Sequence, residues 1–460
     1  MKKIAVLLAF LAFAVLGRAQ KNTDEDAQMV RKIYDIALTQ GQAYPWLSHL
    51  CTQVGGRLSG STNAAAAIAY TKNMLDTLGL DRVWLQPCMV TKWERGPKEE
   101  VSARGIRSGT ALSLPCLALG NSEGSGPEGV TADIIEVHTL EELDALGTQV
   151  RGKIVFFNRP LDQTRINTGE AYGGAADQRV NGPARASKYG ALGAIVRSLS
   201  STLDDYPHTG VTIYDDQKPI PAIAISTLAA DKLSQLIAKE PVRVYMRSEC
   251  GMRGQVQSYN VIGEIRGSEK PDEIIIVGGH LDSWDPGQGA HDDGTGCAQS
   301  MDVLSIIKKT GYQPKRTIRC VLFMNEENGG GGGTAYADSS NAQHEYHLAA
   351  IESDGGGFTP RGFTFEGHKD VASTNYAKMI AYQDLLEPYG IHFARGGSGA
   401  DIAPLRNQKG LLVGLKVDPQ RYFDIHHTSA DTFDKVNRRE LELGAAAMTS
   451  LVCLLDKYGL

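Results

Sequence analysis

Apolar residues recur in four short blocks in the last part of the chain, and polar residues cluster where each block ends. The blocks lie at residues 274–277, 318–324, 348–351 and 411–417. From residue 259 onward such blocks alternate with stretches of helical periodicity, which is typical of a parallel sheet covered by helices. The pattern therefore predicts an α/β fold with a mixed, mainly parallel sheet.

Before residue 259 the pattern changes. Helical spacing in residues 29–37 and 61–78 and a strand-like stretch at 83–90 come first, and then charged residues and glycine interrupt the pattern. From about residue 110 to 254, short β-like runs are separated by glycine, proline and two short helical stretches; these runs lie at 132–137, 153–157, 194–196, 222–225 and 242–246.

A chain of 460 residues is long for one core, so two domains are expected. We predict an inserted β-rich domain at residues 110–254. It would divide the main domain into a first part, 20–109, and a second part, 255–460.

The first residues have the features of a secretory signal. Two lysines precede an apolar run at 4–16, and small residues follow it. This run is shorter than the ~20 residues that span a bilayer. We therefore expect a signal peptide at 1–19, no stable membrane insertion, and export to the periplasm or the extracellular space.

Composition excludes one class of partner. The net charge is −6 and the pI is about 6.0, so no basic excess attracts a nucleic acid. The seven cysteines are too widely spaced for a zinc ribbon, and the sequence does not decide which of them pair.

Polar groups at the carboxyl ends of parallel strands face one crevice, where ligands bind in open α/β sheets. The candidate residues there are imidazoles and carboxylates: His280, Asp292, Glu326, Glu327, Asp354 and His427. Singly, a His-x-Asp or a Glu-Glu pair is an ordinary surface feature. Together, without thiolate, they are a ligand set for zinc, with cobalt or manganese as alternatives.

So many acids in one cleft would repel each other, and two divalent cations would remove that repulsion. Such a pair of cations can share a carboxylate and activate a water between them, and a further acid takes the proton of that water. Asp282 is expected to contact the second nitrogen of His280 and to fix its tautomer. Asp292 is expected near the start of a helix at 298–307.

Five motifs resemble the zinc exopeptidase family of co-catalytic aminopeptidases and glutamate carboxypeptidases. They are NVIGEIRGSEKPDEIIIVGGHLDSW, GAHDDGTG, NEENG, ESDGG and HHTSADT, and the likeness extends to GGRLSGS at 55–61. The resemblance implies one zinc on His280 and Asp354, a second on Glu327 and His427, and a bridging Asp292. It also implies that Glu326 is the general base.

The resemblance selects His427 rather than His426, because the family's histidine stands four residues before an Asp-Thr pair, here Asp431-Thr432. His426 would face the other side if this stretch is extended. The insert resembles a protease-associated domain, which in such enzymes lies beside the cleft as a lid or support and carries no catalysis.

The substrate contacts stay open. Asp401, in GGSGADIAPL, is either a substrate contact or a structural hydrogen-bond acceptor, and His291 either lines the specificity pocket or is a solvated loop residue. Where several family members have an oxyanion-stabilising tyrosine, this chain has Gly397. The oxyanion support then falls to zinc, to Tyr422 or to a neighbouring chain.

The leading hypothesis is an exported dizinc exopeptidase that hydrolyses short peptides, in particular dipeptides. The alternatives are a glutaminyl cyclase of the same fold, which works with one zinc, and a catalytically inactive receptor-like binding protein. The family resemblance also implies a homodimer. The sequence does not decide which peptide terminus is recognised, since both acids and bases lie near the crevice: Asp401, Glu352, Arg395, Arg406 and His291.

Overall fold

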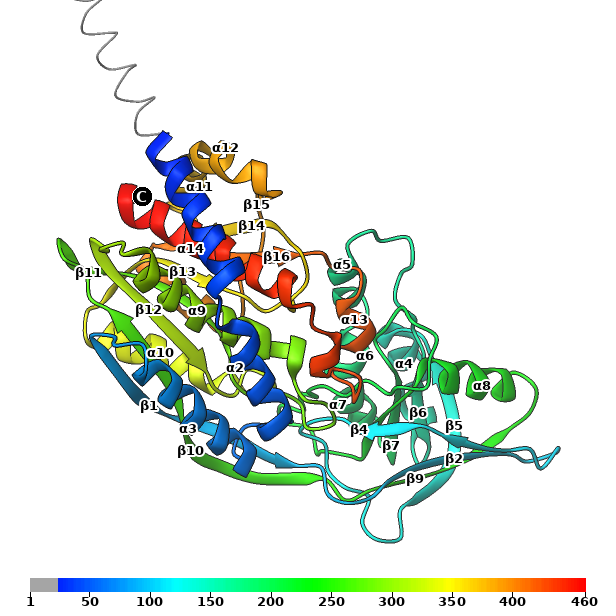
Figure 1. Ribbon diagram of the computed structural model, residues 1–460. Coiled ribbons are helices and arrows are strands. Elements are labelled where there is room, and N and C mark those ends of the chain that lie inside the picture. The colour runs from blue at the N-terminus through cyan, green and yellow to red at the C-terminus, as the bar shows by residue number, and fades with distance from the viewer. Residues whose placement is uncertain (1–23) are drawn as a thin grey trace, which may run out of the picture.

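Two sheets of eight strands organise the protein (Figure 1). The computed structural model describes residues 24–460, and the predicted signal peptide at 1–19 lies outside the described residues. The strand order is β1-β10-β12-β11-β13-β16-β14-β15 in the first sheet and β3-β2-β9-β5-β6-β7-β8-β4 in the second. The fold is mixed α/β, as the sequence pattern predicts.

The centre of the first sheet is parallel. β11 pairs with β12 on one side and β13 on the other, and β13 pairs with β16, all in parallel. β1, β10 and β14 add antiparallel pairs around this centre. The strands are β1 (Arg82–Glu94), β10 (Gly251–Ile265), β11 (Lys270–His280), β12 (Arg316–Phe323), β13 (Tyr346–Glu352), β14 (Pro360–Gly367), β15 (His392–Arg395) and β16 (Leu411–Val417).

Both faces of this sheet are buried, which explains why its strands are continuous apolar runs. Ile275 and Val277 belong to the large core that also includes residues of α9 and α14. Ile274 and Ile276 point to the opposite face, against α10. The helices of this part are 24–40, α2 (Ala43–His49), α3 (Thr62–Asp76), α9 (Thr295–Thr310), α10 (Gly331–Ala342), α11 (Ala372–Met379), α12 (Gln383–Leu386), α13 (Tyr422–Ile425) and α14 (Arg438–Tyr458).

The second sheet has its own cores on its two faces. Its strands are β2 (Glu99–Gly105), β3 (Ala111–Leu114), β4 (Cys116–Ala118), β5 (Val130–Val137), β6 (Ile154–Phe157), β7 (Gly193–Arg197), β8 (Ala222–Ile225) and β9 (Val242–Ser248). The helices beside them are α4 (Leu140–Leu146), α5 (Thr168–Gly173), α6 (Asp177–Val180), α7 (Gly182–Lys188) and α8 (Thr227–Ile237).

This second sheet spans a different range from the insert expected at 110–254. β2 belongs to it, because all seven residues of β2 pair with β9, and β10 returns to the first sheet at Gly251. The charged residues of β2 hide its strand character, since Glu99, Glu100 and Arg104 interrupt the apolar signal while Val101 and Ala103 are buried. The strands of the second sheet therefore lie within residues 99–248, and the insert at 110–254 stays a prediction.

Arg95 joins the two parts of the molecule. Its guanidinium pairs with Asp285 through two hydrogen bonds of 2.7 and 2.8 Å and with Glu99 at 2.9 Å.

Within residues 24–460, no cysteine is in a disulfide.

Candidate metal centre

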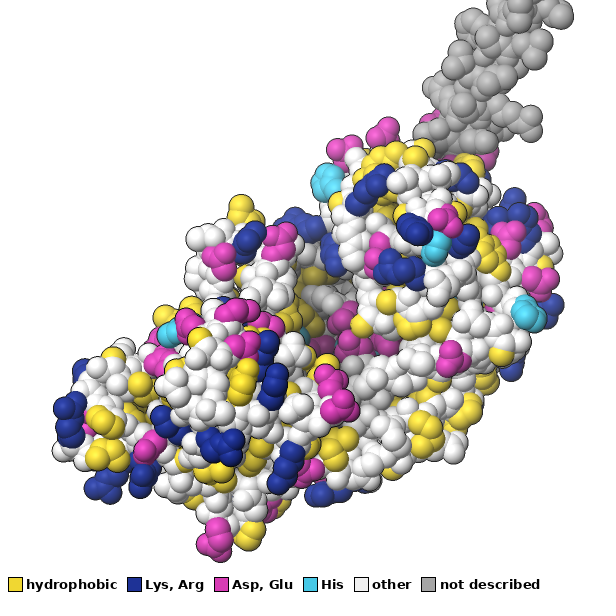
Figure 2. All heavy atoms as spheres, turned by 180° about the vertical axis from the view of Figure 1, so that it is seen from behind, with side chains coloured by type: hydrophobic (Ala, Val, Ile, Leu, Met, Phe, Trp, Pro, Cys, Tyr) yellow, Lys and Arg dark blue, Asp and Glu magenta, His cyan; other side chains and the backbone are white. Residues whose placement is uncertain are grey.

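The four parallel strands at the centre of the first sheet end at the candidate residues. β11 ends at His280, Glu326 and Glu327 follow β12, and Asp354 follows β13. β16 is followed by α13, after which His427 comes. All six predicted residues, including Asp292, line one cavity of about 300 Å³. Figure 2 shows a hollow between two parts of the molecule with acidic side chains on its floor.

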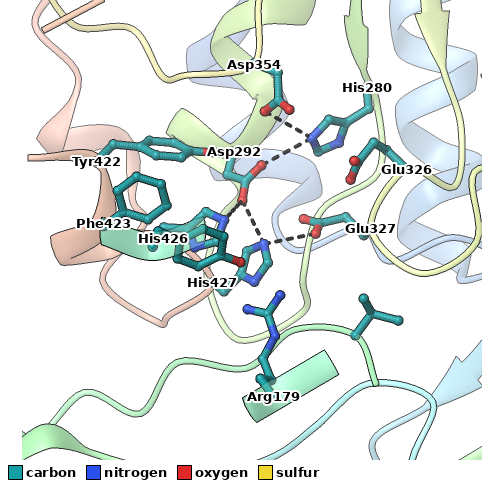
Figure 3. A pocket seen from close by; sticks show the side chains of 12 residues that line it. Arg179, His280, Asp292, Glu326, Glu327, Asp354, Tyr422, Phe423, His426 and His427 are labelled. Atoms are coloured by element: carbon teal, nitrogen blue, oxygen red, sulfur yellow. Dashed lines mark ion pairs between the residues drawn. The ribbon is translucent and has the colours of Figure 1, made fainter. Parts of the chain in front are cut away.

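Asp292 lies at the centre of this cluster (Figure 3). Its Oδ1 is 3.2 Å from Nε2 of His280, and its Oδ2 is 3.1 Å from Nε2 of His427. Asp354 approaches the same nitrogen of His280 at 3.6 Å, and Glu327 approaches that of His427 at 3.1 Å. The two oxygens of Asp292 thus face two separate imidazole and carboxylate pairs, as a bridging ligand would.

The chemistry of these donors fits zinc. Imidazole nitrogens and carboxylate oxygens without thiolate are ligands of zinc in hydrolytic sites. Oδ2 of Asp292 is buried without a hydrogen-bond donor. Burial and the neighbouring Asp292 raise the pKa of Glu327 to about 7, while Glu327 and Asp292 outweigh burial and raise the pKa of His427 to about 10. Without a cation, bound protons would therefore reduce the repulsion between the acids of this cluster.

His426 also lies in this cluster, contrary to the expectation that it faces the other side. Its Nε2 is 3.5 Å from Oδ2 of Asp292, and its ring stacks on that of His427 with centroids 3.5 Å apart. The expectation required an extended chain. Instead α13 ends at Ile425, and His427 has φ +63°, so the turn directs both rings to the same side.

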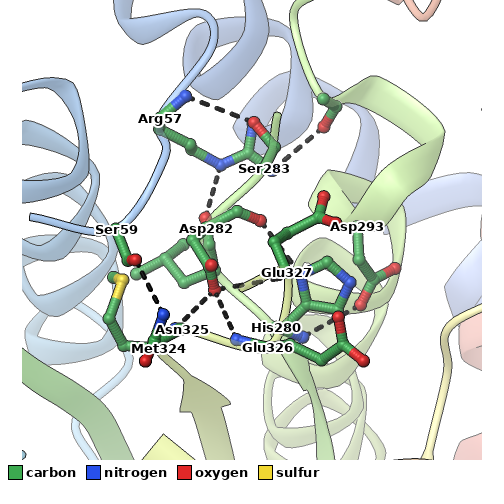
Figure 4. A network of polar contacts seen from close by, with 12 residues as sticks. Arg57, Ser59, His280, Asp282, Ser283, Asp293, Met324, Asn325, Glu326 and Glu327 are labelled. Atoms are coloured by element: carbon green, nitrogen blue, oxygen red, sulfur yellow. Dashed lines mark hydrogen bonds and ion pairs between the residues drawn. The ribbon is translucent and has the colours of Figure 1, made fainter. Parts of the chain in front are cut away.

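Asp282 contacts His280 differently from the expectation. The ring Nδ1 of His280 donates to the main-chain carbonyl of Asp282 at 3.0 Å, whereas the carboxylate lies 4.0 Å away. That carboxylate instead accepts from the amides of Asn325 and Glu326 at 2.6 and 3.1 Å (Figure 4). Asp282 therefore fixes the tautomer of His280 through its backbone and positions the Glu326 loop through its side chain.

Two buried side chains of opposite charge, Arg57 and Asp431, each contact the segment between His280 and Asp292. Arg57 is 0% exposed and donates to the carbonyls of Leu281, Gln288 and Gly289 at 2.5 to 3.0 Å. From the other side, Asp431 accepts from the amides of His291 and Asp292 at 2.8 and 3.1 Å. Sequence reasoning singled out the motifs containing both residues but gave neither a role.

The insert forms one wall of the cavity with Tyr172, Arg179 and Val211. It also holds a candidate ligand. Nδ1 of His427 donates to the carbonyl of Thr209 at 3.2 Å, and the Thr209 amide donates back to the carbonyl of His427 at 3.0 Å. This pairing leaves Nε2 of His427 free to face Asp292.

Arg179 is the residue of this wall that sequence reasoning missed. Arg179 is only 5% exposed, its Nη1 donates weakly to the Thr209 carbonyl at 3.4 Å, and its Nε has no acceptor. It lies in α6, away from every strand end, so no local pattern marks it.

The three tentative substrate residues have different positions. Tyr422 lines the cavity, and burial raises the pKa of its phenol, which therefore stays protonated. His291 is neither solvated nor in the cavity wall: it is 1% exposed, stacks on Phe358 and accepts from the Gly357 amide. Asp401 is buried outside the cavity wall, where burial and Glu352 raise its pKa. Its Oδ2 has no hydrogen-bond partner among the described residues, so the structure assigns Asp401 neither role.

Comparisons with known proteins identify the family of this chain. Residues 260–452 match the family described as Peptidase family M28. The chain is 35% identical to carboxypeptidase Q of Bos taurus over 88% of this chain and 84% of the relative, and equally similar to that of Homo sapiens. The five sequence motifs resemble carboxypeptidase Q as well, so motif and whole-chain similarity point to the same relatives.

Solved structures show the same fold. A peptidase M28 precursor from Shewanella amazonensis superposes with a TM-score of 0.87 at 32% identity, over 93% of this chain and 96% of that one. A zinc aminopeptidase from Bacillus subtilis shares the fold at a TM-score of 0.63 and 18% identity, over 89% and 93% of the two chains.

Among the described residues, no helix is both long and apolar enough to cross a membrane.

Proposed function

This chain belongs to peptidase family M28 and is a zinc-dependent exopeptidase, and on that premise we propose that it is an exported dipeptidase that recognises the free carboxylate of its substrate. Export rests on the signal-like features of the first residues. The substrate class rests on the cavity and, above all, on Arg179.

Arg179 is the observation that carries the proposal. It is the only lysine or arginine among the described residues that line the cavity, and Arg binds carboxylates through paired N–H donors. The Thr209 carbonyl accepts hydrogen bonds from both Arg179 and His427. The guanidinium and a candidate metal ligand are therefore neighbours across this one carbonyl group. A carboxylate held there belongs to the residue directly after the scissile bond, which describes a substrate cut next to its C-terminus.

The name of the relatives, carboxypeptidase Q, also describes cleavage at the C-terminal end of a substrate. The cavity of about 300 Å³ is closed on one side by the insert, so a substrate of two residues fits it better than a long chain.

We propose two zinc ions, one held by His280 and Asp354 and the other by Glu327 and His427, with Asp292 between them. Bound zinc would polarise the peptide carbonyl and make a water acidic enough to react near neutral pH. The geometry of Asp292, with one oxygen toward each imidazole, supports this ligand assignment.

Glu326 is the proposed general base. It lines the cavity beside the ligands, and the Asp282 carboxylate holds its main-chain amide at 3.1 Å. Burial, together with the acids Asp354 and Glu327, raises its pKa well above the usual value. A carboxylate with a raised pKa accepts the proton of the attacking water and then delivers it to the leaving amine.

Tyr422 is the proposed oxyanion donor. Its phenol lines the same cavity and stays protonated, so it can donate to the substrate carbonyl oxygen as that oxygen gains negative charge. The homodimer that the sequence suggests is not needed for any of these roles.

The first experiment measures hydrolysis of Leu-Ala by the purified protein without residues 1–19, with and without a zinc chelator. The same assay uses Leu-Ala amide, which lacks the carboxylate. We expect chelator-sensitive cleavage of Leu-Ala and a kcat/KM about 100-fold lower for the amide, since a lost buried charge pair costs about 2–5 kcal/mol. Equal cleavage of the two substrates would refute carboxylate recognition.

The matched variants are Arg179→Met and Arg165→Met. Arg165 is an exposed arginine of the insert outside the cavity wall. We expect Arg179→Met to lose about 100-fold in kcat/KM on Leu-Ala and little on Leu-Ala amide, whereas Arg165→Met keeps both rates.

A further inference from the structure

The two proposed metal positions differ in their relation to the insert. His280 and Asp354 form what we call the first position, and Glu327 and His427 form the second. In Figure 3 the two positions lie on opposite sides of Asp292, and the second lies on the side of α6, a helix of the insert. The contacts that orient the ligands differ in the same way.

The main domain alone orients the first position. Nδ1 of His280 donates to the carbonyl of Asp282 at 3.0 Å, and the His280 amide donates to the carboxylate of Asp293 at 3.1 Å. Among residues 24–460, no hydrogen bond or ion pair joins the insert to the side chain of His280 or Asp354. The first position is therefore complete without the insert.

The insert orients one ligand of the second position directly. The main chain of Thr209 accepts from the His427 ring and donates to the His427 carbonyl. Gly120 holds the segment that contains Thr209, because the Gly120 amide donates to the carbonyl of Gly210 and the Thr212 amide donates to the carbonyl of Gly120, both at 2.9 Å. The position of the His427 ring thus depends on this pairing inside the insert.

Trp284 connects the insert to both ligands of the second position. Its amide donates to the carboxylate of Glu327 at 3.2 Å, and its ring lies beside that of His427 with centroids 5.8 Å apart. Trp284 is only 3% exposed, and its ring packs in a cluster with Ala118 and Val211 of the insert. A shift of the insert would therefore move Trp284 and, with it, the environment of both ligands.

Gly120 leaves the space that the Trp284 ring occupies. A Cβ atom at residue 120 would overlap Cη2 of this ring and would lie 2.7 Å from Cζ3. Non-bonded carbon atoms normally stay about 3.5–4.0 Å apart. Any side chain at residue 120 would therefore displace Trp284 or separate the insert from the main domain. One glycine thus supports Glu327 through Trp284 and His427 through Thr209.

We propose that the insert determines the affinity of the second metal position, with Gly120 and Trp284 as positioning residues, while the first position binds its metal without this support. Separation of the insert from the main domain would then release the metal between Glu327 and His427 and leave the other metal bound. This inference rests on the proposed function, because it takes the assignment of ligands to two zinc ions from there.

The test counts zinc ions bound by Gly120→Ala. The protein is equilibrated at graded concentrations of free zinc, and zinc per chain is measured by atomic absorption. We expect two zinc ions in the wild type. In the variant, the first should bind with unchanged affinity and the second about 10–100-fold more weakly, as with other groups that orient ligands. Hydrolysis of Leu-Ala should return when free zinc is raised by the same factor.

The matched control is Gly173→Ala. It adds the same methyl group to an exposed glycine of the insert that lies outside the cavity wall and has no atom within 4 Å of the added carbon. We expect both zinc affinities of this variant to equal those of the wild type.

A second variant relieves the overlap. Trp284→Phe shortens the ring and keeps the main-chain amide that donates to Glu327. Combined with Gly120→Ala it makes room for the added methyl group, so we expect the double variant to regain most of the lost affinity of the second position. The double variant also provides the zinc count if circular dichroism shows that Gly120→Ala alone does not fold.

The outcomes separate this inference from the proposed function. A Gly120→Ala protein that binds both zinc ions as tightly as the wild type would overturn the inference and leave the dizinc dipeptidase standing. Equal weakening of both zinc ions, in the single variant or in the double variant that replaces it, would overturn the inference too, since the insert would then support the whole centre. A wild-type protein that binds one zinc ion, or does not hydrolyse Leu-Ala, would overturn the proposed function and this inference with it.

Discussion

Glu326 and Glu327 are neighbours in sequence with different environments at the same centre. Glu327 contacts His427 at 3.1 Å, whereas among the described residues Glu326 has no side-chain partner at hydrogen-bond distance. This difference agrees with the proposed roles, in which Glu327 holds a metal and Glu326 moves a proton.

Glu326→Gln should therefore abolish activity and keep the metal. An amide cannot take a proton from water, and removal of a general base costs about 10²–10⁴-fold in kcat. The measurement is kcat on Leu-Ala together with zinc content by atomic absorption. An active Glu326→Gln protein with full zinc content would refute the assigned mechanism.

Asp431 acts on the metal centre through the backbone. Both carboxylate oxygens of Asp431 accept hydrogen bonds from main-chain amides. In Asp431→Asn, an NH₂ group replaces one of these oxygens, so a donor faces a donor there. Displacing Asp292 should weaken zinc binding by about 10–100-fold, as with other groups that orient ligands. Chelator competition measures it, with the exposed Asp434→Asn as control. Unchanged zinc affinity would restrict Asp431 to a purely structural role.

At this scale the sequence analysis identified residues that follow strands, and Asp292 and His427 through the family motifs, but it gave no role to Arg179 or Arg57. His280, Glu327 and Asp354 are placed by strand ends, which apolar periodicity reveals. Arg179 and Arg57 act through tertiary contacts with distant segments, and no spacing encodes such contacts. His426 was predicted wrongly because the left-handed conformation of His427 reverses the side on which its neighbour lies.

Among the elements, α9 stabilises the start of α2 with a buried acid. Gln42, at the N-terminal end of α2, makes no capping contact through its side chain. Instead Oδ2 of Asp302, in α9, accepts from the amides of Gln42 and Ala43 at 3.0 and 3.3 Å. Burial raises the pKa of Asp302 to about 6.

This raised pKa predicts a pH dependence of stability. The folded protein binds the proton more tightly than the unfolded chain, so the free energy of unfolding falls as pH rises from about 4 to about 6. Asp302→Asn should make the decrease smaller by up to about 3 kcal/mol, the contribution of two pKa units, and should leave the contribution of other buried acids such as Glu327. Urea unfolding of the zinc-free protein at pH 4.5 and 6.5 measures it. A variant with the wild-type decrease would exclude Asp302 as its source.

Element prediction succeeded where burial is uniform and failed where polar residues interrupt it. The four central strands, buried on both faces, are continuous apolar runs that the sequence shows directly. β2 was not predicted, because its exposed positions carry charges and its pairing with β9 spans more than a hundred residues. Long-range pairing of this kind depends on the partner strand, which local periodicity does not identify.

For the whole molecule, zinc and stability should be linked, and more strongly at high pH. Without zinc, the raised pKa of Glu327, about 7, makes the folded state lose stability as pH rises from about 4.5 to 7. The stability that protonated His427 contributes is lost as pH rises from about 6.5 toward 10, in the same direction.

The Tm with and without a zinc chelator, at pH 5.5 and pH 8, measures this linkage. We expect the chelator to lower Tm at both values and by more at pH 8, because zinc binds the deprotonated ligands. The same shift at both values would contradict the linkage.

The sequence analysis expected an insert beside the cleft, but it did not identify the residues with which the insert lines the cavity. Its glycine-rich, short-stranded texture distinguishes it from the rest of the chain. The contact of Thr209 with His427 depends on how two folded units dock, and docking leaves no local signature.

That contact has a consequence for the order in which the site is built. The insert precedes every candidate ligand along the chain, and His427 is the last of them to be synthesised. The main-chain groups of Thr209 are therefore synthesised before the ring that they orient. A chain that stops before residue 427 has the surface that receives this ring but cannot complete the second metal position, so incomplete chains carry no finished protease.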